Sequence, residues 1–195
     1  MIDSVSRRSG ELFESGFYCA ESVLLAITES KGISSDLIPR IATGFCGGIS
    51  RTCGMCGAVS GAVMAINLFT GRNSPGESVM ASYNAVRKLL EMFESRFGST
   101  NCRQLIGCDL GTEKGQNFFK SNNLLQQCRR YTEEATGMAM LVIEEKGLNP
   151  APCSEGTSPE RDTKCETFDN KQAREHQERH SEAHGYEPNE RIQEN

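Results

Sequence analysis

Apolar residues in the first 148 positions recur at intervals of three and four, and no convincing two-residue alternation appears. This spacing is typical of amphipathic helices and predicts an all-α fold. Long helices are expected over residues 4–30, 53–69, 75–97 and 123–146, with shorter ones over 36–45 and around Cys102. The pattern therefore predicts a single compact bundle of five to six helices, forming one domain over residues 1–148.

Residues that commonly begin or end helices support these boundaries. Gly32 and Gly98 follow two of the expected helices and favour the left-handed conformation that closes a helix end. Ser74-Pro75-Gly76-Glu77 has the spacing of a capping box, with Ser74 as the N-cap and Glu77 reaching back to it. This tetrapeptide predicts a sharp helix start at Pro75.

A glycine-rich turn between Phe45 and Gly61 carries three cysteines, Cys46, Cys53 and Cys56. Cys53 and Cys56 form a Cys-x-x-Cys pair at the expected start of the helix over 53–69. Free N–H groups and the helix dipole at such a position favour the ionised sulfur, which attacks disulfides and binds metals. We therefore expect Cys53 and Cys56 to be the catalytic residues of any thiol chemistry, with Cys56 first.

The chain contains nine cysteines, at positions 19, 46, 53, 56, 102, 108, 128, 153 and 165. The first residues lack the apolar stretch of a secretory signal, so we expect a cytoplasmic protein. In a reducing compartment, clustered cysteines are more often catalytic or metal-binding than structural bridges. No membrane span is predicted, because the best candidate, Met55 to Phe69, is shorter than a bilayer requires.

Residues 149–195 differ from the rest of the chain in charge. They carry six basic and eleven acidic side chains, which accounts for the whole net charge of −5. With few apolar residues, this segment is predicted to be a disordered polar tail. Its histidines at 176, 180 and 184 and its cysteines at 153 and 165 are interpreted first as ordinary tail residues. The remaining body is neutral without a basic patch, which argues against nucleic-acid binding.

Several segments in order resemble the redox-active family named for its C-GCAxxG-C-C cysteine pattern. They are Phe17 to Val23, Gly44 to Ile49, Cys56 to Gly61, Cys102-x-x-Leu105-x-Gly107, and Cys128. The resemblance covers about residues 5–147 and implies a small helical, cytoplasmic redox protein of bacteria or archaea, similar to the non-haem part of split-Soret-type cytochromes. It places the four signature cysteines at Cys19, Cys56, Cys102 and Cys128. Cys46, Cys53 and Cys108 are additions to that pattern.

The leading hypothesis is a cofactor-binding site for electron transfer with a redox partner. Four thiolates are the usual ligands of an iron–sulfur cluster, and the ligands of such a metal centre would be Cys19, Cys56, Cys102 and Cys128, with Cys46 or Cys53 as substitutes. One alternative is dithiol/disulfide exchange between Cys53 and Cys56.

A non-enzymatic structural zinc module ranks lower than either redox reading, because only Cys53 and Cys56 have the close spacing of zinc ligands. A c-type haem is excluded at this pair, because Gly57 stands where that motif requires histidine. A homodimer is compatible with short helices that have exposed faces, because such faces often pair.

Overall fold

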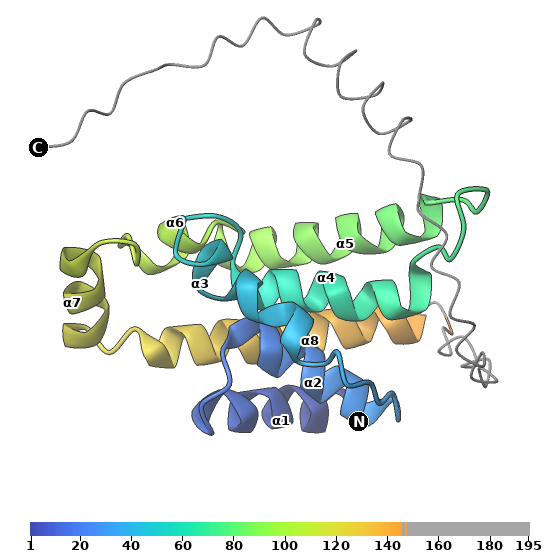
Figure 1. Ribbon diagram of the computed structural model, residues 1–195, viewed down its shortest axis with the longest axis horizontal. Coiled ribbons are helices and arrows are strands. Elements are labelled where there is room, and N and C mark those ends of the chain that lie inside the picture. Colours follow the sequence, from blue (N-terminus) through green and yellow to red (C-terminus); the bar gives the residue numbers. More distant parts are fainter. Residues whose placement is uncertain (146, 148–195) are drawn as a thin grey trace, which may run out of the picture. The chain divides into compact units, whose positions relative to one another are not determined.

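The computed structural model describes residues 1–145 and 147, and in this part of the chain it contains eight α-helices, one 3₁₀ helix and no β-strand (Figure 1). The prediction of an all-α fold is confirmed there, although the helices outnumber the five to six expected. The predicted tail, with its cysteines and histidines, lies outside the described residues. The helices are α1 (Ile2–Glu14), α2 (Cys19–Ser30), η1 (Arg40–Phe45), α3 (Cys46–Ile49), α4 (Gly57–Thr70), α5 (Met80–Phe97), α6 (Cys102–Ile106), α7 (Glu113–Ser121) and α8 (Leu125–Glu145).

Helix α8 packs against α1, α2, α4 and α5, and α2 packs closely against α4 (Figure 1). Their inner faces bury large apolar side chains, which supply most of the stabilisation of such a bundle. The small residues of α4 permit this packing, because a Cβ on Gly61 would stand 2.9 Å from the Cα of Ala20 on α2. Fully buried side chains include Leu24, Ile27, Ile66, Leu89, Phe93 and Ile143.

The helix predicted over residues 4–30 is in fact two helices, α1 and α2. Gly16 interrupts it with φ of +110°, a conformation that side chains other than glycine rarely adopt. The second helix then begins beside Tyr18, whose N–H donates a 2.8 Å hydrogen bond to the Glu21 carboxylate. The spacing of apolar residues continues across the break because α1 and α2 each bury an apolar face in the core.

The predicted helix starts at Pro75 and Cys53 are both wrong. Ser74 to Glu77 form only a turn, closed by a 3.2 Å hydrogen bond from the Glu77 N–H to the Ser74 carbonyl, and α5 begins at Met80. Residues 54–56 pair instead with residues 100–102, so that α4 begins at Gly57. A local turn therefore replaces the first helical turn expected at Pro75, and the pairing with residues 100–102 replaces the one expected at Cys53.

The short helix at Cys102 is confirmed as α6, capped by Asn101, whose side chain accepts a 3.1 Å hydrogen bond from the Gln104 N–H. The segment over 36–45 is a 3₁₀ helix that begins only after Pro39. Helix α7 was not predicted, because its only large apolar side chains are Phe118 and Phe119 and it buries only Gly115. It lies at one end of the bundle, and no other helix of the described chain packs closely against it (Figure 1).

None of the helices in residues 1–145 is both long enough and apolar enough to cross a lipid bilayer.

Candidate functional site

Four cysteines from four different elements line one small buried cavity of about 30 Å³. Cys19 begins α2, Cys56 is the N-cap of α4, Cys102 begins α6 and Cys128 lies in the first turn of α8. All are free thiols. We call this space the thiol cavity; its other lining residues are Gly47, Gly57, Leu105, Ile106, Leu110 and Tyr131.

Backbone hydrogen bonds hold the segments of Cys56 and Cys102 together. The Cys56 N–H donates to the Thr100 carbonyl at 2.7 Å, and the Cys102 N–H donates to the Gly54 carbonyl at 2.9 Å. The side chain of Asn101 adds a 2.6 Å hydrogen bond to the Cys53 carbonyl. This short pairing places two cysteines that are distant in sequence on one wall of the thiol cavity.

The turn between Cys46 and Cys53 has an uncommon backbone. Residues 47–51 all have positive φ, between +52° and +72°. For residues other than glycine, each such conformation costs roughly 1–2 kcal/mol. Gly48 also leaves no room for a side chain, because a Cβ there would stand 2.5 Å from the Cβ of Cys102. The left-handed segment, residues 47–51, therefore brings the chain directly over α6.

Cys46 lies beside Cys19, and a hydrogen bond between the two thiols raises the pKa of Cys46 above its usual range. Cys46 also donates to the Ala42 carbonyl, at an Sγ–O distance of 3.6 Å. The Cys19 sulfur occupies the space that a side chain on residue 57 would need. The glycine that follows Cys56 thus allows Cys19 to approach the start of α4.

Burial dominates the acidity of the other signature thiols. It raises the pKa of Cys56 and Cys102 to about 11 and that of Cys128 to about 12, with smaller contributions from neighbouring thiols. At Cys56 the backbone N–H groups of Ala58 and Val59 act in the opposite direction but do not prevail. The expectation that the helix start would favour an ionised Cys56 is therefore wrong, because desolvation outweighs the helix N-terminus.

Cys53 does not line the thiol cavity. A hydrogen bond to Asp109 raises the pKa of Cys53 and lowers that of Asp109, while the Arg103 guanidinium opposes the rise at Cys53. After burial, electrostatic repulsion from Cys53 also contributes to the raised pKa of Cys102. Cys53 and Cys56 stand on non-helical backbone, with φ of +62° at Cys53. Cys53 thus interacts with Asp109 and Cys102 and lies outside the lining of the thiol cavity.

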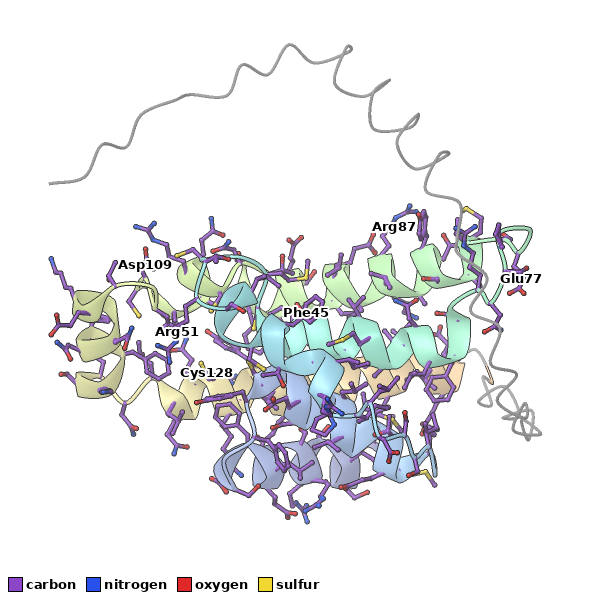
Figure 2. The ribbon with its side chains drawn as sticks, viewed as in Figure 1. Phe45, Arg51, Glu77, Arg87, Asp109 and Cys128 are labelled. Carbon is purple, nitrogen blue, oxygen red and sulfur yellow. The ribbon has the colours of Figure 1, made fainter. Side chains whose placement is uncertain are left out.

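A second and much larger cavity, of about 740 Å³, adjoins the thiol cavity and shares Cys19, Gly47, Leu110 and Cys128 with it. We call it the outer cavity. Arg51 and Cys128 mark its position at the end of the bundle near α7 (Figure 2). Sequence reasoning missed it, because α7 had not been predicted. Its remaining lining residues are Phe13, Tyr18, Thr43, Cys46, Ser50, Arg51, Gln116, Phe119, Lys120, Asn123 and Leu125.

The thiol cavity fits a thiolate-bound metal centre in donor type and in donor number, since it is lined by four cysteines. In their observed positions, however, the cysteine sulfurs are not spaced to hold a metal centre. In residues 1–145 and 147, no three His, Cys, Asp or Glu side chains are arranged to hold a metal ion. A volume of 30 Å³ corresponds to about one water molecule. Ligation would therefore require the sulfurs to rearrange and the cavity to widen.

Comparison with known proteins gives one family and one relative. Residues 17–142 match the family model described as "Putative redox-active protein (C_GCAxxG_C_C)". A protein of Archaeoglobus fulgidus, itself described as uncharacterized, is 32% identical over 112 residues, and the match covers 53% of this chain and 74% of the relative. No solved structure was found to match the chain.

Proposed function

Because the chain belongs to the C_GCAxxG_C_C family of redox-active proteins, we propose that it transfers electrons through a metal centre, most simply an iron–sulfur cluster. Its ligands would be Cys19, Cys56, Cys102 and Cys128. The observation that carries the proposal is that these four cysteines, from four elements, line one buried cavity. Four thiolates are the usual ligand set of such clusters.

The acidity of the buried thiols supports ligation over nucleophilic attack. With pKa values of about 11 for Cys56 and Cys102 and about 12 for Cys128, almost no thiolate exists at neutral pH. Thiol–disulfide exchange needs an accessible thiolate. A bound metal cation deprotonates the thiols that coordinate it, so that they are present as thiolates at neutral pH.

The surroundings suit a water-excluded redox centre. Leu105 and Ile106 are buried and supply an apolar wall. The Tyr131 hydroxyl donates a 3.0 Å hydrogen bond to the Leu105 carbonyl. The N–H groups of Ala58 and Val59 point at the Cys56 sulfur, and hydrogen bonds to ligand sulfurs are one means of tuning a cluster's potential. A bound cluster would supply reversible one-electron transfer.

A second candidate function is dithiol/disulfide exchange, now centred on Cys19 and Cys46. The observation that favours it is the contact between these two thiols beside the outer cavity, which both of them line. Oxidation of the pair would form one S–S bond and pass two electrons and two protons to a disulfide substrate, which leaves as two thiols. The exchange expected at Cys53 and Cys56 gains no comparable support.

The deciding experiment is metal analysis of the full-length protein purified without oxygen, with its visible spectrum, iron, acid-labile sulfide and zinc content. We expect stoichiometric iron and sulfide in the wild type, and their loss in Cys56→Ser. Cys108→Ser is the matched control, because Cys108 is a buried thiol that does not line the thiol cavity. Its iron and sulfide should equal those of the wild type.

Retention of iron and sulfide by Cys56→Ser would overturn the ligand assignment. If zinc is the only metal found, the site is a structural metal site and not a redox centre. If the protein holds no metal even after anaerobic reconstitution with iron and sulfide, dithiol/disulfide exchange is the remaining candidate function. Mass spectrometry would then test it by detecting a Cys19–Cys46 disulfide after mild oxidation.

A further inference from the structure

We infer that the outer cavity binds a small organic anion with an apolar body. The cavity measures about 740 Å³, within the range of roughly 300–1,000 Å³ that is usual for small-molecule sites. Such sites combine mostly apolar walls with a few polar groups that orient the ligand. Here the apolar part of the wall comes from Phe13, Leu110, Phe119 and Leu125.

The charged groups of the cavity wall are both cations, Arg51 and Lys120, and no carboxylate lines the cavity. Within the described part of the chain, neither side chain takes part in a hydrogen bond or ion pair. This distinguishes them from Arg8, Arg96 and Arg129, each of which pairs with a glutamate. Two unpaired cations beside an apolar space favour an anionic ligand over a neutral or cationic one.

Most other polar side chains of the wall already have partners within the protein. Ser50 donates to the Gly44 carbonyl at 2.9 Å, Gln116 donates to the Leu110 carbonyl at 3.0 Å, and Thr43 donates to the Glu21 carboxylate at 2.6 Å. Arg51 and Lys120 are therefore the groups best able to select the charge of a ligand.

The two cations come from different elements. Arg51 belongs to the left-handed segment and Lys120 to α7, which packs closely against no other described helix. A ligand between them would also lie against Cys19 and Cys128, which line both cavities. Binding of the anion itself does not depend on the proposed metal centre.

The test is isothermal titration calorimetry of the full-length protein with dodecanoate, and with dodecyltrimethylammonium as a cation of equal chain length. We expect one dodecanoate to bind per chain, and at least about tenfold weaker binding of the cation. The double variant Arg51→Gln/Lys120→Gln should weaken dodecanoate binding at least about tenfold, since two charge-assisted contacts are lost.

The matched control is Arg87→Gln/Lys114→Gln, which removes the same two charges from exposed positions outside the cavity; Arg87 lies on α5, far from Arg51 in Figure 2. Its dodecanoate affinity should equal that of the wild type, and circular dichroism should show equal helicity in all variants. Equal affinity for the two surfactants, or unchanged dodecanoate binding in Arg51→Gln/Lys120→Gln, would overturn the inference.

The Cys56→Ser variant separates this inference from the proposed function. It should lose iron but keep its affinity for dodecanoate. An iron-loaded wild type that does not bind dodecanoate would refute the anion site alone. A wild type that binds dodecanoate but holds no iron, even after reconstitution, would refute the metal centre alone.

Discussion

At the scale of single residues, the chemistry of each cysteine depends on how deeply it is buried. Cys56 is only 6% exposed, and the removal of water raises its pKa although it stands at the start of a helix. The pKa of Cys53, three residues earlier, is raised chiefly by its hydrogen bond with Asp109. Two cysteines of one short motif thus have different environments and different roles in the proposed site.

The raised pKa of Cys56 predicts how the stability of the metal-free protein depends on pH. The folded state holds the proton up to about pH 11, whereas an unfolded thiol loses it near pH 9. The stabilisation is therefore fully present below pH 9 and is lost as the pH rises toward 11. Between pH 9 and 10.5 the free energy of unfolding should fall by about 1.5 kcal/mol more in the wild type than in Cys56→Ala.

Urea unfolding of both metal-free proteins across this range measures the difference. The other groups that titrate there are common to the two proteins, so their contributions cancel. Parallel pH profiles would mean that burial does not control the acidity of Cys56.

At the scale of helices and turns, a few polar contacts decide where elements begin and how they join. The buried carboxylate of Glu21 accepts a hydrogen bond from the Tyr18 N–H at the start of α2. It also accepts a 2.6 Å hydrogen bond from the Thr43 hydroxyl of η1. Glu21 therefore connects the element that carries Cys19 with the element that leads to Cys46.

Glu21→Ala should destabilise the protein by about 3 kcal/mol, because two hydrogen bonds to a buried charged group are lost. Glu77→Ala is the matched control. The Glu77 carboxylate also accepts two hydrogen bonds, from the Asn73 N–H and the Ser74 hydroxyl, but in an exposed turn remote from the site (Figure 2). Its replacement should cost less than about 1 kcal/mol. Equal costs in urea unfolding would contradict the role given to Glu21.

At the scale of the whole described molecule, the tightly packed helices and the loosely attached α7 enclose different spaces. The thiol cavity lies among buried parts of the bundle, while the outer cavity has α7 as part of its wall. Of the residues of α7 only Gly115 is buried, whereas most of α4 is buried against α2 and α8. The thiol cavity is thus enclosed by well-packed elements, whereas the outer cavity depends partly on a helix with few buried residues.

This difference predicts the pattern of hydrogen exchange. Amides of α7 should exchange at least about 100-fold faster than those of α4, because helices with few buried contacts open locally without global unfolding. Dodecanoate should slow exchange in α7 but not in α4. Equal protection of the two helices, measured by mass spectrometry of their peptides, would show that α7 is part of the rigid bundle.

Local sequence signals account for much of this protein. The three- and four-residue spacing of apolar positions determined that the described chain is helical, and the short helix expected around Cys102 is present as α6. These signals suffice because each helix must present one apolar face to the core. The Ser74 tetrapeptide misled, because a turn that stops after one hydrogen bond uses the same residues as a helix start.

The site depended on contacts that no local pattern contains. The motif of Cys19, Cys56, Cys102 and Cys128 identified the family, but only packing of α2, α4, α6 and α8 brought the four thiols to one cavity. The acidity of Cys56 was equally a tertiary property, since desolvation by the surrounding helices outweighed the helix start. Helical periodicity depends on neighbours along the chain, whereas cavities and burial depend on contacts between residues that are distant in sequence. For this reason the sequence determined the helices, and the tertiary structure decided the chemistry of the cysteines.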